Sequence, residues 1–305
     1  MNNRTLKRYE GQVVKYCFLP NTDPFCTNAC NHCYIRSLES LNNRVKKSDA
    51  RILSEIEGLV NDGYQVQPYT TELLLTPNWK NILRTVGEKK VYTNGKIVAE
   101  KHEVINEMTR EGIKEMYITG NVPGYHNRLN LVNPDIINTV IGLASDAGIE
   151  SIVTLLITRD SFNHLSEMID YYEPKKVRKF NMIRVVGGTD SVISRRQTDE
   201  FLESFRKIRQ ENGMDMNLDS SLGKCSTNPV RGEEMFCGAG TDKVAIGLDD
   251  FIYPCSMLQF RQYRMGIFRD GEILVKKRSR SRVRLDKNDC MAYQLLKSRR
   301  IAEND

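Results

Sequence analysis

Three cysteines near the start of the chain have the spacing of a metal-binding loop. Cys26, Cys30 and Cys33 follow one another as C-x3-C-x2-C. Thiolates are soft ligands that bind iron–sulfur clusters well, so the loop suits a [4Fe-4S] cluster. Three thiolates leave one iron without a protein ligand, and a distant residue or a small chelating molecule must complete it. A structural zinc loop is the alternative, although such loops normally carry paired C-x2-C knuckles.

The composition of the whole chain fits a protein that keeps its thiols reduced. The sequence has 305 residues, eight cysteines and a formal net charge of +6. It contains no signal-peptide core and no apolar run of the length that a membrane span needs, so we expect a cytoplasmic protein without a membrane partner. Eight cysteines in that setting favour metal-binding thiolates over a disulfide scaffold. The basic run from Lys276 to Arg284 is either solvated surface or a site for an anionic partner, among which nucleic acid is the least favoured.

The elements that must position the cysteine loop alternate between strands and helices. Residues 12–19 crowd β-branched and aromatic side chains and predict a buried strand, which the loop then follows. Apolar residues recur with helical periodicity from Asp49 to Asn61. Further helices are predicted at 79–86, 101–112, 134–147, 162–172 and 198–212, and further strands at 64–69, 90–93, 115–119, 151–157, 179–186 and 214–218. These repeated units predict an α/β fold, a partial (β/α)6 barrel of the TIM type, with its chemistry at the carboxyl ends of the strands.

The sequence changes in character after about residue 222. Cysteines, glycines and short apolar runs replace the long helices, and Val244–Leu248 with Phe251–Tyr253 predicts a hairpin around the turn Asp249-Asp250. We therefore predict two domains, a barrel over residues 1–222 and a smaller module over residues 223–305.

The cysteine loop, followed by the aromatic residue Tyr34, resembles the radical S-adenosylmethionine (radical SAM) family. Three later segments resemble motifs of the family and follow in the same order. Thr70-Thr71-Glu72 corresponds to the motif Gly-Gly-Glu, and Thr93-Asn94-Gly95 to the motif Thr-Asn-Gly. Thr119-Gly120-Asn121 corresponds in part to the motif Ser-x-Asp-Gly. The resemblance covers about residues 12 to 295. It implies that SAM occupies the open iron, and that one electron from the cluster cleaves SAM to a 5'-deoxyadenosyl radical. That radical would remove a hydrogen atom from the substrate.

The resemblance also implies which residues bind the cofactor. It assigns Glu72 to the ammonium group of SAM, Thr119 to the carboxylate or ribose, and Arg184 to the SAM carboxylate or an anionic substrate. The other residues expected to bind the cofactor are His32, Tyr34, Thr93 and Asn94. The alternatives are a capping or surface role for Glu72, and ordinary tight turns at the ends of the strands for Asn94 and Thr119.

The C-terminal module resembles the SPASM/twitch extension of the same superfamily. The resemblance implies that Cys237, Cys255 and Cys290 hold an auxiliary [4Fe-4S] cluster. Cys225 is either its fourth ligand, or a catalytic donor of a hydrogen atom to a substrate radical, or a buried and unreactive cysteine. The family usually has Asp-Gly in the hairpin turn, where this chain has Asp249-Asp250.

These features predict a radical SAM enzyme of the oxidoreductase or isomerase type, reduced by a flavodoxin- or ferredoxin-type donor. A small polar natural-product intermediate, such as a sugar, a cyclitol or a nucleotide, is the expected substrate, with oxidation, rearrangement or epimerisation as the outcome. A peptide-modifying maturase is the alternative. Enzymes of that kind often carry an extra leader-binding domain, and we expect none ahead of Cys26 because only 25 residues precede it. A non-enzymatic iron–sulfur regulator is a third possibility and would form no 5'-deoxyadenosine.

Overall fold

The structure is a computed structural model, and its described residues form two compact units. It describes residues 6–21, 26–31, 33–124, 131–172, 177, 179–185, 192–219, 222, 227–228, 233–234, 239–240, 242–276, 290 and 292. The first unit comprises Met1–Cys26, Tyr34–Glu88 and Cys237–Asp286, and the second comprises Thr27–Cys33, Lys89–Phe236 and Lys287–Asp305.

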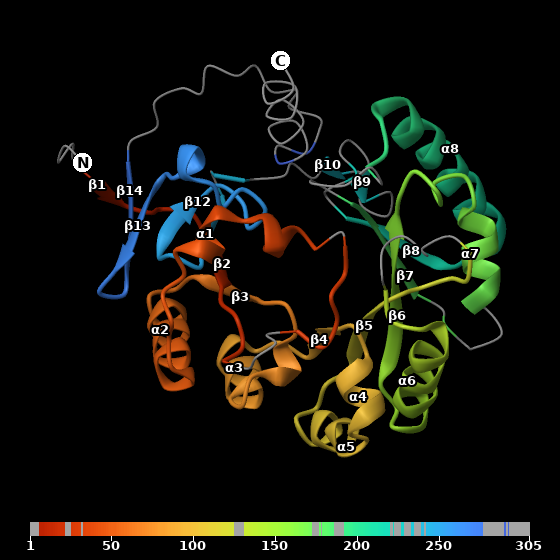
Figure 1. Cartoon of the computed structure of the whole chain (residues 1–305), viewed down its shortest axis with the longest axis horizontal. Coiled ribbons are helices and arrows are strands. Elements are labelled where there is room, and N and C mark those ends of the chain that lie inside the picture. Colours follow the sequence, from red (N-terminus) through yellow and green to blue (C-terminus); the bar gives the residue numbers. More distant parts are fainter. Residues whose placement is uncertain are drawn as a thin grey trace. The chain divides into compact units, whose positions relative to one another are not determined.

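A seven-stranded sheet forms the centre of the first unit, in the order β1-β14-β13-β12-β11-β2-β3 (Figure 1). Its strands are β1 (Leu6–Arg8), β2 (Val13–Cys17), β3 (Gln65–Tyr69), β11 (Lys243–Ile246), β12 (Phe251–Tyr253), β13 (Gly266–Arg269) and β14 (Glu272–Lys276). Strand β2 pairs in parallel with both β3 and β11, while β12, β13, β14 and β1 add on as antiparallel neighbours. One sheet therefore joins strands from the two ends of the described chain.

Helices accompany this sheet. They are α1 (Glu39–Asn42), α2 (Asp49–Asn61) and α3 (Trp79–Val86), with the 3-10 helices η1 (Tyr34–Ser37), η2 (Leu73–Leu75) and η6 (Arg261–Tyr263). Two of them, α2 and α3, have the predicted bounds. In α2 the side chains of Ile52, Ile56 and Leu59 are buried, and the Ser48 hydroxyl caps the helix by accepting from the Arg51 amide.

The second unit contains a five-stranded parallel sheet in the order β4-β5-β6-β7-β8. Its strands are β4 (Lys90–Thr93), β5 (Glu115–Thr119), β6 (Glu150–Ile157), β7 (Lys179–Arg184) and β8 (Asp215–Leu218), and a short antiparallel pair consists of β9 (Thr227–Asn228) and β10 (Glu233–Glu234). The helices are α4 (Lys96–Glu100), α5 (Glu103–Arg110), α6 (Pro134–Asp146), α7 (Leu165–Tyr172) and α8 (Arg195–Asn212). This alternation of parallel strands and helices confirms the predicted mixed α/β architecture.

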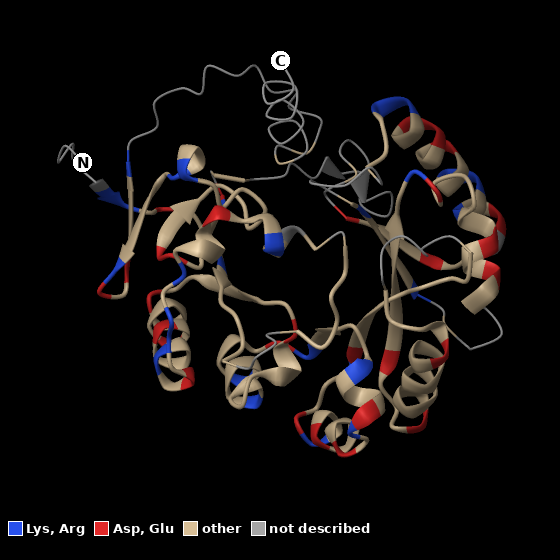
Figure 2. Cartoon of the chain, viewed as in Figure 1, with Lys and Arg blue, Asp and Glu red and all other residues tan. Residues whose placement is uncertain are grey.

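The two faces of the five-stranded sheet differ in polarity. Ile118, Val153 and Phe180 are fully buried on the face that the helices cover, and a Cβ added at Gly95 would touch both Ile118 and Val140 of α6. The opposite face carries Tyr92, whose side chain is 56% exposed. The charged residues of the second unit lie largely on its helices, with both signs along α8 (Figure 2).

Most predicted element boundaries agree with the structure to within a few residues. The helix predicted at 101–112 is confirmed as α5. Helix α4 before it was not predicted; it starts where Gly95, at a φ of +84°, turns the chain and the Asn94 side chain accepts from the Lys96 amide. The hairpin around Asp249-Asp250 is confirmed, since β11 and β12 pair antiparallel. The domain boundary at residue 222 stays a prediction. In the described part of the chain, no helix has the length and apolar character to span a membrane.

Candidate functional site

The cysteine loop presents thiols that a metal could reach. Cys26, Cys30 and Cys33 are each half-buried and not in disulfides. The Cys33 amide donates to the Cys30 carbonyl at 3.2 Å, and the Asn28 side-chain amide lies 3.1 Å from the Cys30 Sγ. Among the described residues, no three Cys, His, Asp or Glu side chains are grouped as for a metal ion. The donor set nevertheless fits an iron–sulfur cluster, because reduced thiols at this spacing are its usual ligands.

The Thr-Asn-Gly segment at the end of β4 holds this loop. The Asn94 Nδ2 lies 3.1 Å from the Thr27 hydroxyl, and the Lys96 Nζ donates to the Thr27 carbonyl at 3.2 Å. Thr93 is buried, and its hydroxyl accepts from the Gly95 amide at 3.0 Å. Two residues predicted to bind the cofactor thus adjoin the loop that carries Cys30 and Cys33, while their contact with SAM stays a prediction.

Glu72 follows the carboxyl end of β3 in the first unit. Its side chain is 1% exposed, and the residue directly precedes η2. The nearby Thr70 hydroxyl is buried and has no hydrogen-bond partner among the described residues. A buried hydroxyl without a partner is uncommon in a folded protein and fits a position that a ligand completes. A carboxylate and a hydroxyl at one strand end would suit an ammonium group.

Thr119 and Arg184 lie on opposite faces of the five-stranded sheet. Thr119 is half-buried at the end of β5, on the face that points away from the helices. Arg184 is 2% exposed and shares the helix-covered face with Phe180 and Met182 of β7. Its Nη1 lies 3.5 Å from the Thr198 hydroxyl of α8. The predicted anchoring role of Arg184 therefore stays a prediction for a side chain that the helix α8 contacts.

The remaining cysteines differ strongly in their surroundings. Cys17 is buried in the cluster of Ala245, Leu248 and Tyr253, and burial raises the pKa of its thiol to about 12. It therefore stays a neutral thiol, as the apolar strand around it suggests. Cys255 is half-buried after β12, and Cys290 is buried and belongs to the second unit. His32, Cys225 and Cys237 lie outside the described residues, as does the side chain of Tyr34.

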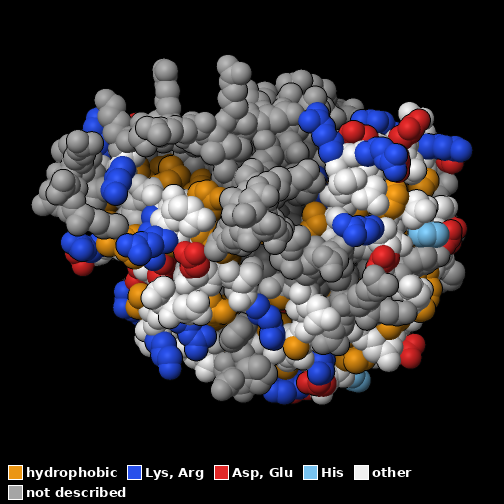
Figure 3. Space-filling model, turned by 45° about the horizontal axis from the view of Figure 1, so that its top comes forward, with side chains coloured by type: hydrophobic (Ala, Val, Ile, Leu, Met, Phe, Trp, Pro, Cys, Tyr) orange, Lys and Arg blue, Asp and Glu red, His pale blue; other side chains and the backbone are white. Residues whose placement is uncertain are grey.

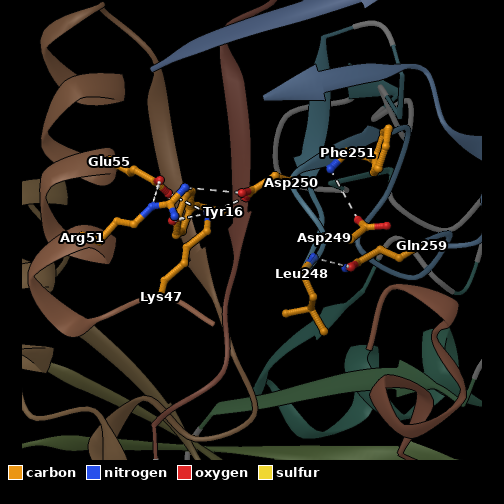
Figure 4. Close-up of polar contacts among 9 residues, drawn as sticks. All are labelled: Tyr16, Lys47, Arg51, Glu55, Leu248, Asp249, Asp250, Phe251 and Gln259. Atoms are coloured by element: carbon orange, nitrogen blue, oxygen red, sulfur yellow. Dashed lines mark hydrogen bonds and ion pairs between the residues drawn. The ribbon is translucent and has the colours of Figure 1, made fainter. Parts of the chain in front are cut away.

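A buried charge network that the sequence did not predict holds the turn before Cys255 (Figure 4). Lys47 extends its Nζ to within 2.6 Å of the Glu55 Oε2 and 2.5 Å of the Asp250 Oδ1. The same Nζ lies 4.9 Å from the centre of the Tyr16 ring, and the Tyr16 hydroxyl donates to Glu55. Asp250 has a φ of +59°, a conformation that favours glycine. Asp250 therefore places a carboxylate at a backbone position that glycine adopts more readily.

The two carboxylates of this network respond differently to their surroundings. Burial raises the pKa of Asp250, and its contacts with Lys47 do not compensate. Burial also acts to raise the pKa of Glu55, but hydrogen bonds from Lys47 and Tyr16 outweigh it and lower the pKa. Glu55 is thus the carboxylate whose ionised form the network stabilises.

The other residue of the turn, Asp249, fixes the hairpin itself. Its carboxylate is buried and accepts from the Tyr253 hydroxyl at 2.9 Å and from the Arg264 Nη2 at 2.7 Å. The Arg264 guanidinium lies 3.8 Å from the centre of the Phe251 ring. These contacts order the strand that leads to Cys255.

The segment after Cys255 is held as firmly. The Gln259 Oε1 accepts from the Leu248 amide at 3.0 Å and from the Ser40 hydroxyl at 2.6 Å, while its Nε2 donates to the Ser256 carbonyl at 2.9 Å. Hydrogen bonds and ion pairs therefore surround Cys255 on both sides in the sequence. The sequence signal of this arrangement is the turn itself, since Asp250 stands where the resemblance to the family predicts the glycine of an Asp-Gly turn.

The charged residues on the described part of the surface do not indicate a binding site. On the face drawn in Figure 3, Lys and Arg side chains of the described residues alternate with Asp and Glu. Residues 277–284 of the predicted basic run lie outside the described residues. The expected anionic partner of this run thus stays a prediction.

Comparisons with known proteins identify the fold. No family model matches the sequence, and no curated protein is significantly similar to it. The structure of anSMEcpe with bound AdoMet matches with a TM-score of 0.61 at 14% identity, over 84% of this chain and 77% of that chain. Streptococcus suis SuiB bound to the precursor peptide SuiA matches with a TM-score of 0.63 at 15% identity, over 84% of this chain and 62% of that chain.

A third match is native anSMEcpe with bound AdoMet and the Kp18Cys peptide, with a TM-score of 0.62 at 16% identity, over 83% of this chain and 77% of that chain. The chain shares the fold of these proteins. It spans about three fifths of the length of SuiB.

Proposed function

We propose that this chain is a radical SAM enzyme that cleaves S-adenosylmethionine reductively and uses the resulting radical to remove a hydrogen atom from its substrate. The observation that carries the proposal is the contact between the Thr-Asn-Gly segment and the cysteine loop, through Asn94 and Thr27. It occurs in a fold that two AdoMet-bound structures share. A zinc loop would need no such strand-end motif.

The residues of the chain have separate tasks in this proposal. Cys26, Cys30 and Cys33 hold a [4Fe-4S] cluster, which when bound supplies one electron to SAM. Asn94 orients the loop through Thr27, and the Asn28 amide donates toward the Cys30 sulfur. Hydrogen bonds to cluster sulfurs tune the reduction potential.

At the end of β3, Glu72 binds the ammonium group of SAM, and the Thr70 hydroxyl takes a position that the family gives to glycine. The Glu72 carboxylate and the Thr70 hydroxyl would replace the water molecules that hydrate the ammonium group in solution. The remaining proposed cofactor-binding residues are His32, Tyr34, Thr93, Thr119 and Arg184.

We further propose a second [4Fe-4S] cluster held by Cys237, Cys255 and Cys290, with Cys225 as its fourth ligand or as a hydrogen donor to the substrate radical. The support is the fixed turn that leads to Cys255, in which Asp249 and Asp250 are both bound. A ligand on a pre-ordered turn loses little conformational entropy when it binds metal.

The substrate of the main proposal is a small polar natural-product intermediate, and a flavodoxin- or ferredoxin-type protein is the electron donor. A second candidate is a peptide substrate. It is favoured by one observation, namely that two of the structures with this fold contain peptides, SuiA in one case and Kp18Cys in the other.

The decisive experiment measures 5'-deoxyadenosine from SAM and dithionite with anaerobically prepared protein. We expect formation by the wild type and none by Cys26→Ala, with Cys17→Ala as the matched control because that thiol is buried and neutral. About eight irons per chain would support two clusters and about four only one. Protein that binds iron but forms no 5'-deoxyadenosine would be a regulator, and the proposal would be wrong.

A further inference from the structure

Four uncharged polar side chains form a row across the five-stranded sheet. Thr119 of β5 lies opposite Thr154 of β6, Thr154 opposite Asn181 of β7, and Asn181 opposite Asn217 of β8. Partners in register share one face of a sheet. This face is the one opposite Ile118, Val153 and Phe180, which the helices cover.

The side chains of this polar row are not engaged in hydrogen bonds with one another or with their described neighbours, and three of them are at least partly exposed, while Thr154 is buried. Within the described residues, none of the four donates or accepts a hydrogen bond through its side chain, and Asn217 is exposed. The strands of a parallel sheet are normally apolar on both faces. Packing therefore does not account for four hydrogen-bonding groups in register.

Acidic residues outnumber cations on the same face of the strands, where Glu115, Glu150 and Asp215 lie with Lys90 and Lys179. Lys179, two residues before Asn181, lies 3.1 Å from the Glu115 Oε1 and 2.9 Å from the Glu150 Oε2. A phosphate or carboxylate group would need a cation without such partners. The stacked rings of Tyr92 and Tyr117, with centres 4.6 Å apart, add an apolar surface before the row.

We propose that Thr154, Asn181 and Asn217, beside the Thr119 assigned to SAM, bind the substrate, and that the part they bind is an uncharged, hydroxylated ring of the sugar or cyclitol kind. An Asn carboxamide offers a donor and an acceptor to two neighbouring hydroxyls, and a Thr hydroxyl offers either. Neighbouring strands are about 4.8 Å apart, so adjacent members of the row reach different substituents of one ring. The inference rests on the proposed function and narrows its substrate class, since it excludes a phosphate at this position.

The test uses ligand-observed NMR saturation transfer on anaerobically prepared holoprotein with matched pairs of probes. The pairs are myo-inositol with myo-inositol 1-phosphate, and N-acetylglucosamine with its 6-phosphate; an end-blocked tripeptide is the peptide probe. We expect the neutral member of each pair to bind better. Asn181→Ala and Asn217→Ala should each weaken that binding by about threefold to tenfold, because each removes one or two neutral hydrogen bonds.

Two further variants separate binding from folding. Asn217→Gln keeps the carboxamide and should restore most of the binding that Asn217→Ala loses. Asn106→Ala, at an exposed position of α5, should change nothing. Preference for the phosphate esters, binding of the tripeptide alone, no transfer to any neutral probe, or binding as strong as that of the wild type by both Asn181→Ala and Asn217→Ala would each overturn the assignment.

The SAM chemistry is tested separately by substrate-free 5'-deoxyadenosine formation in the wild type. If no 5'-deoxyadenosine forms but neutral probes bind selectively, the proposed reaction is wrong and the proposed binding site stands. If 5'-deoxyadenosine forms but no neutral probe binds, the proposed reaction stands and the binding site is wrong.

Discussion

The cysteine loop and the Asp249-Asp250 turn are held by different kinds of interaction. The loop is held at Thr27 by hydrogen bonds from the uncharged side chain of Asn94 and from the Lys96 ammonium group. Its cysteines are half-buried. Ion pairs that are largely out of water hold the turn, where Lys47 lies against Glu55 and Asp250. The turn is thus ordered by the chain itself.

This difference indicates what each region requires from a metal. Under the proposed function, a turn fixed by buried ion pairs presents Cys255 before any iron binds, whereas a loop held by uncharged groups and one lysine gains further order from its ligand. The four predictions that follow test this contrast, from the largest expected effect to the smallest.

Lys47→Met removes the cation that two carboxylates share. We expect a loss of about 3–5 kcal/mol in the free energy of unfolding, because Glu55 and Asp250 would remain buried without their counterion. Urea denaturation measures this change in the free energy of unfolding. Lys46→Met, at the exposed neighbouring position, should cost about 0.5 kcal/mol or less. Equal losses in the two variants would show that the ion pairs do not hold the turn.

Removal of iron should affect the two regions unequally. We expect hydrogen exchange at the Cys33 amide to slow by about tenfold or more when iron binds, since ordering worth about 1.4 kcal/mol gives that factor. The Met265 amide, which donates to the Ile252 carbonyl at 2.7 Å, should exchange equally slowly with and without iron. Mass spectrometry of exchanged peptides compares the two, and an iron-dependent hairpin would contradict the contrast.

Acid should separate the two carboxylates of the network. The pKa of Glu55 is lowered, so its contribution to stability is present at neutral pH and is lost as the pH falls through its folded pKa. The pKa of Asp250 is raised, mainly by burial, so its contribution is lost as the pH rises through its folded pKa.

The stability difference between wild type and Glu55→Gln should therefore grow as the pH rises through the carboxyl range, and that between wild type and Asp250→Asn should shrink. Urea denaturation at a series of acidic pH values measures both. Parallel slopes for the two variants would refute the assignment of opposite shifts.

Asn28→Ala should lower the reduction potential of the loop cluster. The Asn28 amide lies 3.1 Å from the Cys30 Sγ, and a donor to sulfur stabilises the reduced and more negative cluster. A hydrogen bond worth about 0.5–1.5 kcal/mol corresponds to about 20–60 mV for one electron. Redox titration followed by EPR measures the shift, with Asn42→Ala at the exposed end of α1 as control. An unchanged potential would mean that this contact does not reach the cluster.

The sequence predicts most of the fold because its elements are locally encoded. The helix at Asp49–Asn61 and the strands at Lys90–Thr93 and Glu115–Thr119 have the predicted bounds. Helix α4 was not predicted. Its start depends on a hydrogen bond to the Asn94 side chain and not on a periodic pattern of apolar residues. The cysteine loop could be proposed as a metal site because ligand spacing is itself a local property, and its metal binding stays a prediction.

The networks between distant residues required the structure. Lys47 stands in a polar stretch that reads as solvated surface, and its partner Asp250 is far away in the sequence. The polar positions of Asn181 and Asn217 are visible in each strand, but strand register alone places them side by side.

The position of β11 in the sheet constrains how the protein is made. Val13 of β2 pairs with Lys243 of β11, so one edge of β2 has no partner until nearly the whole chain has left the ribosome. Throughout that interval the thiols of the loop are already synthesised and can meet the machinery that delivers iron and sulfide. Cutting the gene after residue 222 would remove this neighbour, and the product would expose an aggregation-prone edge of β2 instead of folding as an independent domain.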